Sequence, residues 1–284
     1  MKRRLPPSVW FGLLVIAASE AGMLRHLEPF WSWHTPIAWT GYILFVDGLL
    51  WQRRGHSPLS DAPAEALFTA AVSIPLWIIF EQYNKYTLHN WHYEGLPEVL
   101  LVRYVGYAWA FATIWPAIFE TAELVGSLRD RRAPAFRLHP PPRIPLGAIG
   151  WASIVAGALM LLVPIVHPSQ WLAAPVWLGF IFLLDPINAA AGDESIRGDL
   201  ARSRPDRLIN LLAGGLLCGV LWEFWNYWAH TKWIYHVPVP PHVKVFEMPL
   251  AGYAGFPPFA LECFAMYVLV RRWFWRGMRR PVGL

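Results

Sequence analysis

Long runs of hydrophobic residues, separated by short polar segments, make up most of the chain. Each run is about 17 to 30 residues long with few charges, enough for a helix to cross the hydrocarbon core of a bilayer. The pattern therefore predicts an all-α integral membrane protein with about eight transmembrane helices. The expected spans are residues 8–24, 36–52, 65–84, 99–128, 145–166, 171–190, 207–229 and 248–270.

The composition narrows the class of protein further. Hydrophobic residues make up 56% of the chain and charged residues only 15%, whereas a soluble domain carries about 25% charged residues. Cys218 and Cys263 both lie inside apolar runs, so a disulfide framework or a zinc knuckle is not expected. The chain also lacks a Gly-rich nucleotide loop, a Ser/His/Asp or Cys/His order and repeated His boxes, which disfavours ATP-driven, dehydrogenase and desaturase activities.

The positive charges divide unevenly between the two sides of the expected membrane. If the N-terminus is cytoplasmic, all but five of the 24 Lys and Arg residues fall in cytoplasmic segments, as the positive-inside rule predicts. The net charge of +5 is then a result of topology, and no nucleic-acid partner is expected. This pattern predicts a multi-pass protein of the cell membrane with both termini in the cytoplasm. The five other basic residues are Arg25, Lys85, Arg103, Lys232 and Lys244.

The sequence contains an internal duplication. A group of four residues recurs at an offset of 142 positions: Glu81, Asn84, Trp91 and Tyr93 match Glu223, Asn226, Trp233 and Tyr235. Residues 41–47 resemble 179–185, and residues 116–120 resemble 258–262. Because each half has an even number of spans, the halves are expected to be parallel four-helix repeats. The expected division is 1–128 for the first repeat, 129–144 for a basic, Pro-rich cytoplasmic linker, and 145–284 for the second repeat with a basic C-terminal tail.

Carboxylates inside the spans are the candidate functional groups. A charge at the centre of a bilayer costs about 2.5–3.5 kcal/mol, so such residues usually serve a function or bind another helix. Asn84 and Asn226 accompany two of them as orienting groups. The depth of the acids in the spans predicts an outer level with Glu81 and Glu223 and an inner level nearer the cytoplasm with Glu120 and Glu262. The acids within spans are Glu20, Asp47, Glu81, Glu120, Asp185, Glu223 and Glu262.

A metal site is not predicted, although three histidines are candidate ligands. His89 and His92 are close in sequence beside Glu94, and His230 follows Glu223 and Asn226 along one helix face. One histidine and one carboxylate supply only two good ligands there, so a hydrogen-bond ladder explains the face better. No cofactor is predicted.

Tryptophans within the spans suggest the kind of substrate. Many of the 18 Trp residues fall at span ends, as an aromatic belt requires, but Trp77, Trp109, Trp115, Trp222 and Trp225 lie near the buried acids. Indole faces can stabilise a carbocation or bind a polyene or quinone, although packing alone also explains these residues. The favoured function is acid–base chemistry on a lipid or isoprenoid, in an acidic and aromatic site built by both repeats. The expected partner is a membrane lipid or other hydrophobic small molecule. The alternatives are a proton-coupled transporter or exporter and a membrane scaffold or assembly factor without catalysis; copies of the chain could also associate into a homo-oligomer.

Overall fold

The computed structural model describes residues 4–130, 141–238, 243–275 and 282 of the chain. Most of the expected linker and much of the basic tail, residues 131–140, 276–281 and 283–284, therefore lie outside the described residues. The long helices are α1 (Pro7–Leu24), α2 (Phe30–Arg54), α4 (Pro63–Tyr83), α5 (Leu100–Ala112), α6 (Ile114–Arg129), α7 (Gly147–Val166), α8 (Ala173–Ala191), α10 (Asp206–Trp228) and α11 (Phe256–Phe274). The short elements are α3 (Pro58–Asp61), η1 (Asn84–Leu88), β1 (Trp91–Glu94), η2 (Gln170–Leu172), α9 (Ile196–Ala201), β2 (Lys232–Tyr235), β3 (Lys244–Val245), β4 (Met248–Pro249) and η3 (Leu250–Gly255).

Six helical segments of the described chain are long and apolar enough to cross a membrane. The described residues thus form a helical protein compatible with a multi-pass membrane protein. The two other expected spans correspond to α2, which has 25 residues, and to the consecutive helices α5 and α6. The six segments are Pro7–Leu24, Pro63–Leu88, Gly147–Val166, Gln170–Ala191, Asp206–Trp228 and Leu250–Phe274.

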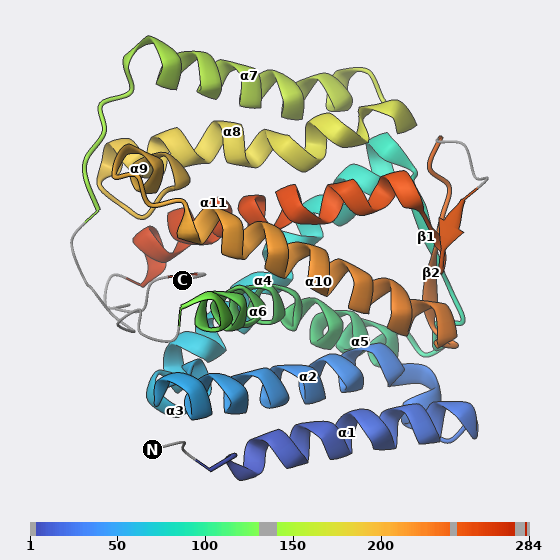
Figure 1. The fold of residues 1–284 in the computed structure, drawn as a ribbon. Helices are drawn as coiled ribbons and strands as arrows, with labels where there is room; N and C mark the ends of the chain where they lie inside the picture. Colours follow the sequence, from blue (N-terminus) through green and yellow to red (C-terminus); the bar gives the residue numbers. More distant parts are fainter. Residues whose placement is uncertain (1–3, 131–140, 239–242, 276–281, 283–284) are drawn as a thin grey trace.

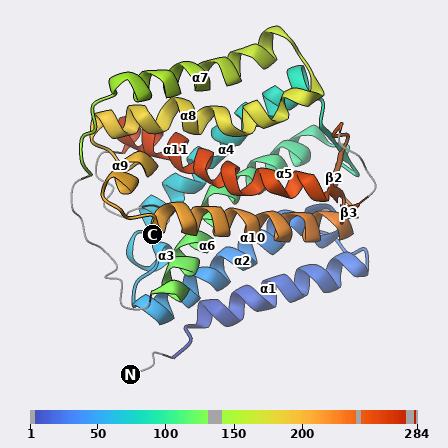
Figure 2. The same ribbon diagram turned by 45° about the horizontal axis from the view of Figure 1, so that its top comes forward.

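The long helices run roughly alongside one another in a flat bundle (Figures 1 and 2). Figure 1 shows the order α7, α8, α11, α10, α6, α2, α1 from one edge to the other, with α4 behind the middle of the bundle. The short helices α3 and α9 lie at one end, where α1 begins and α11 ends, and β1 and β2 lie at the opposite end. The two outermost helices each depend on one neighbour for close packing.

Glycines allow that close packing at both edges. A Cβ atom added to Gly12 of α1 would lie 2.5 Å from the carbonyl oxygen of Gly41 in α2, and one added to Gly157 of α7 would lie 2.7 Å from that of Gly179 in α8. Both distances are shorter than any real contact, so only glycine permits these backbones to approach. The outer helix pairs α1–α2 and α7–α8 are therefore joined in the same way.

The expected fourth span, 99–128, is divided into two helices, which corrects the prediction of a single helix. Pro116 has no N–H and cannot complete the helical hydrogen bonds of the preceding turn. Ser73 of α4 inserts its hydroxyl group at this break, where it accepts a hydrogen bond from the Trp115 N–H (3.2 Å) and donates one to the Phe111 carbonyl. The side chain thus satisfies backbone groups that have no water partner in a membrane. In contrast, Pro257 and Pro258 stand in the first turn of α11, where proline interrupts nothing.

A two-stranded antiparallel ribbon closes the end of the bundle opposite α3 and α9. In it, Trp91 of β1 faces Tyr235 of β2, and Tyr93 faces Trp233. Because side chains alternate between the faces of a strand, these four aromatic rings share one face of the ribbon. That face meets the interior of the bundle.

Asp47 and Asp185 bind the starts of the two short helices α3 and α9, at the end of the bundle opposite the ribbon. Asp47 accepts hydrogen bonds from the Ser57 hydroxyl and the Leu59 N–H (both 2.8 Å) at the start of α3. Asp185 accepts from the N–H groups of Ile196 (2.6 Å) and Arg197 (2.9 Å) at the start of α9. Negative charge at a helix start is stabilising, so both aspartates have a structural role here.

Candidate functional site

An aromatic cavity of about 480 Å³ lies between the ribbon and the helices. Eight of the 18 tryptophans line it. Among the described residues, its lining contains two charged side chains, Arg103 and Lys232, and no acidic one. Such a cavity has the size and apolar character of a site for a hydrophobic small molecule. Its helical walls include Trp39, Trp77, Phe111, Trp177, Trp222 and Phe259.

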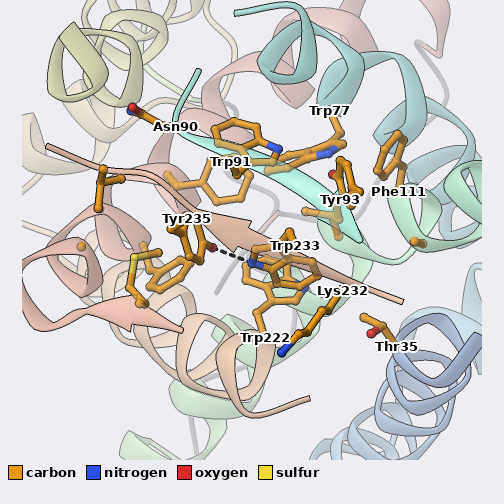
Figure 3. Close-up of a pocket in the computed structure, with 18 of the residues that line it drawn as sticks. Thr35, Trp77, Asn90, Trp91, Tyr93, Phe111, Trp222, Lys232, Trp233 and Tyr235 are labelled. Carbon is orange, nitrogen blue, oxygen red and sulfur yellow. Dashed lines mark hydrogen bonds between the residues drawn. The ribbon is translucent and has the colours of Figure 1, made fainter. Parts of the chain in front are cut away.

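The ribbon supplies the remaining wall of the aromatic cavity (Figure 3). All four aromatic residues of its inner face, Trp91, Tyr93, Trp233 and Tyr235, line the cavity. Trp77 of α4 lies 6.2 Å from Trp91, measured between ring centroids. Residues from both halves of the chain therefore meet on one surface.

The outer acids Glu81 and Glu223 stand behind the tyrosines of the ribbon. Glu81 Oε1 accepts hydrogen bonds from the Tyr93 hydroxyl (2.5 Å) and the Trp77 indole N–H (2.8 Å). Glu223 Oε1 accepts one from the Tyr235 hydroxyl (2.8 Å), and that hydroxyl accepts one from Trp233 Nε1 (2.7 Å). Neither carboxylate lines the cavity, so each reaches the cavity through its tyrosine.

Burial keeps both phenols in their protonated form. Burial raises the pKa of Tyr93 well above its usual value of 10, and the neighbouring Glu81 carboxylate raises it further. The pKa of Tyr235 is raised in the same way, by burial and then by Glu223. At neutral pH each tyrosine is therefore uncharged, and its hydroxyl group donates a hydrogen bond to the glutamate behind it.

The buried amides Asn84 and Asn226 bind the backbone of the ribbon. Asn84 Oδ1 accepts from the N–H groups of Asn90 (2.8 Å) and Trp91 (3.0 Å), and its Nδ2 donates to the Trp91 carbonyl (2.7 Å). Asn226 bonds both backbone groups of Trp233, at 2.8 Å each. These bonds fix each strand against the helix that carries the acid. In these hydrogen bonds the partners of both amides are backbone groups, so the amides influence the acids only by positioning the strands.

The inner acids Glu120 and Glu262 do not line the aromatic cavity. Glu262 is fully buried and accepts a hydrogen bond from the Phe180 N–H of α8 (2.8 Å), while its Oε2 has no partner among the described residues. Glu120 lies beside a smaller cavity of about 60 Å³, with Glu123 and Tyr267. The structure therefore connects Glu81 and Glu223 to the wall of the cavity through their tyrosines, and it leaves the inner acids apart from that wall.

The candidate histidines do not form a metal centre in the described part of the chain, where no group of three metal-ligand residues occurs. His89 is exposed. His92 bonds Glu94 (3.1 Å) and His236 (2.8 Å) on the surface of the ribbon, and His230 stacks on Trp31 at 4.2 Å between centroids. The His92–His236 contact crosses the two strands, so no local spacing could have indicated it.

Tyr93 and Tyr235, which lie between the acids and the cavity, were not predicted to have a role. The signal was present, because Tyr93 and Tyr235 recur at the same offset as the acids. A second buried cluster was also not predicted: His34 is 1% exposed and bonds the Ser19 hydroxyl (2.9 Å), beside Glu20, which accepts from Trp225 Nε1 (3.0 Å).

Comparisons with protein-family models, with curated proteins and with solved structures give no significant match to the chain.

Proposed function

We propose that the chain is a membrane enzyme that performs acid–base chemistry on an isoprenoid or other unsaturated lipid in the aromatic cavity. The observation that carries the proposal is the pair of tyrosines, Tyr93 and Tyr235, which line one cavity and each bind a carboxylate behind it. The tyrosines are the proposed catalytic residues. Glu81 and Glu223 are the proposed proton store behind them, and Asn84 and Asn226 the proposed positioning residues.

The reaction best suited to this arrangement is the shift of a carbon–carbon double bond. The π electrons of the substrate take a proton from one tyrosine, whose oxygen recovers a proton from its glutamic acid. Indole faces such as those of Trp77 and Trp222 stabilise the resulting carbocation. The second tyrosine then passes its proton to its ionised glutamate while its oxygen takes a proton from the adjacent carbon, whose C–H electrons form the new double bond. The reaction is redox-neutral, and proton exchange with water returns one glutamate to its protonated state and the other to its ionised state.

The proposal includes the expected topology of eight spans in two parallel repeats, with both termini in the cytoplasm. Matched features of the two halves support it. Gly-mediated helix pairs lie at both edges, aspartates bind the starts of α3 and α9, and buried amides bind the two strands. The antiparallel register of the ribbon, centred on the His92–Ile234 pair, relates Trp91 to Trp233 and Tyr93 to Tyr235 by an approximate two-fold axis.

Deuterium incorporation tests the reaction. Membranes that contain the protein are incubated in D₂O with a total isoprenoid extract, and the lipids are analysed by mass spectrometry. A proton added to carbon appears as a new C–D bond. We expect the wild type to label a lipid species, and Glu223→Gln and Tyr235→Phe to lower the labelling rate by about 100-fold, the usual contribution of general acid–base catalysis.

Tyr227→Phe is the matched control, because Tyr227 is 40% exposed on α10 and does not line the cavity. This control should label like the wild type. Equal labelling by wild type and Glu223→Gln, in proteins with the same thermal stability, would exclude the proposed chemistry. If labelling is absent and pH-driven solute flux into proteoliposomes depends on Glu262, the chain is a transporter; if the variants change stability alone, it is a scaffold.

A further inference from the structure

The wall that α2 contributes to the aromatic cavity carries two unpartnered polar atoms. Thr35 and Trp39 are one helical turn apart, so they share one helix face, and both line the cavity. Trp39 is 1% exposed. Trp39 Nε1 and Thr35 Oγ1 are buried and have no hydrogen-bond partner among the described residues. An unsatisfied buried polar group costs about 1–3 kcal/mol, so this arrangement indicates a missing partner.

A third unpartnered atom lies elsewhere on the lining. Asn90 is 2% exposed, and its Oδ1 has no partner among the described residues. Figure 3 shows Asn90 and Thr35 on opposite sides of the view of the cavity. Other polar groups of the lining are satisfied within the protein, for example Trp77 Nε1 by Glu81 and the Thr231 hydroxyl by the Gly95 carbonyl (2.6 Å). Among the described residues of the lining, the buried polar atoms without a partner are therefore those of Thr35, Trp39 and Asn90.

We propose that Thr35 and Trp39 form a polar subsite that binds an uncharged oxygen atom, a hydroxyl or a carbonyl, of a hydrophobic ligand. An indole N–H only donates, so the ligand atom at Trp39 must be an acceptor. The Thr35 hydroxyl can donate to the same oxygen or accept from it. Asn90 Oδ1 only accepts, and it suits a hydroxyl group or a bound water. This inference rests on the proposed role of the aromatic cavity as the substrate site and adds that the substrate is oxygenated.

The charges of the cavity argue against an anion at this subsite. Among the described residues, the cations of the lining are Arg103 and Lys232, and Lys232 is paired with Glu247 at 2.9 Å. Neither Trp39 Nε1 nor Thr35 Oγ1 has a hydrogen bond to a described residue, so no charged group is bound at this position, and a buried anion is costly without a bound cation. A neutral oxygen needs only the two hydrogen bonds that these residues offer.

Binding of three matched probes tests the subsite. Farnesol, farnesene and farnesyl phosphate share a chain of 15 carbons and differ in bearing a hydroxyl group, no oxygen or an anion. Each is titrated into the full-length protein in nanodiscs, with tryptophan fluorescence as the signal and empty nanodiscs as the blank. We expect the wild type to bind farnesol about tenfold more tightly than farnesene, a ratio that corresponds to about 1.4 kcal/mol and lies within the net contribution of a hydrogen bond.

Two variants and one control assign the preference to α2. Trp39→Phe and Thr35→Val should each reduce the preference for farnesol to less than about threefold and leave farnesene binding within about twofold of wild type. Thr231→Val also removes a hydroxyl group from the lining, but one already bonded to Gly95, so it should keep the full preference. Because Thr35→Val is nearly isosteric, it remains informative if Trp39→Phe fails to fold.

Three other binding results would overturn the inference. Equal binding of farnesol and farnesene by the wild type would show a cavity without a polar subsite. Tightest binding of farnesyl phosphate, lost in Arg103→Gln, would assign an anionic ligand. Binding of no probe would refute the subsite and the isoprenoid part of the proposed function together. A farnesol preference without any deuterium incorporation would keep the subsite and reject only the proposed chemistry.

Discussion

Asn226 is fully buried, and its amide bonds both backbone groups of Trp233. We expect Asn226→Ala to destabilise the protein by about 2 kcal/mol, because two buried backbone groups lose their partners. The measurement is thermal unfolding of the purified protein in detergent, where the midpoint should fall by about 4–8 °C. Gln82→Ala, an exposed amide on α4, is the control and should leave the midpoint unchanged. An unchanged midpoint for Asn226→Ala would contradict the role assigned to this amide.

Single residues also mark the limit of prediction from the sequence. The repeat spacing indicated that Glu81 and Asn84 belong with Glu223 and Asn226, and the structure gives each set the same kind of neighbours. The spacing did not indicate that the amides bind strands or that Tyr93 lies between its acid and the cavity. Those facts depend on the pairing of two strands 142 residues apart, which local periodicity does not record.

The loop between α8 and α9 is bound to two helices through one carboxylate. Glu194 pairs with Arg207 of α10 at 2.8 Å and with Arg271 of α11. Burial raises the pKa of Glu194, but Arg271 and Arg207 outweigh this effect and hold it below 4.5. The charged form is therefore favoured by folding, so its stabilisation is present above pH 4.5 and is lost as the pH falls through the lower folded pKa.

Glu194→Gln should accordingly lower stability by about 3 kcal/mol at pH 7, because Arg207 and Arg271 each lose a buried carboxylate, although Arg207 keeps its ion pair with Asp199. The wild-type unfolding midpoint should fall on acidification below pH 4.5, and the difference from Glu194→Gln should shrink over that range. Asp193→Asn is the matched control, since the Asp193–Arg272 pair is more exposed and of little energetic value. A constant difference between wild type and Glu194→Gln from pH 7 to pH 3 would contradict this account.

The helices themselves were the easiest elements to predict, because long apolar runs determine them. The division of the expected span 99–128 into α5 and α6 at Thr113 was not predicted. Pro116 lies close to this break, but the break also depends on Ser73, which belongs to another helix. The β1–β2 ribbon was missed entirely. Its strands have only four residues each, too short for a period to stand out, and pairing between the two halves of the chain stabilises them.

The arrangement of the whole molecule determines which loops face the same side of a membrane. The end that holds α3 and α9 also holds the start of α1 and the end of α11, and the ribbon is at the other end (Figure 1). Arginines stand at several helix ends there, among them Arg54, Arg129 and Arg272. The positive-inside rule then predicts that this end faces the cytoplasm.

Cysteine labelling in intact cells tests this orientation. The native Cys218 and Cys263 are fully buried, so the wild type should give no background with a membrane-impermeant maleimide. Glu98→Cys places a thiol at an exposed position beside the ribbon, and Leu200→Cys places one on α9, where Leu200 is 49% exposed. We expect the cysteine at position 98 to be labelled in intact cells and that at position 200 only after permeabilisation. The reverse pattern would put both termini outside. Labelling of both positions in intact cells would mean that the two ends of the bundle do not lie on opposite sides of the membrane. The uneven distribution of Lys and Arg between the two ends would then need an explanation other than membrane topology.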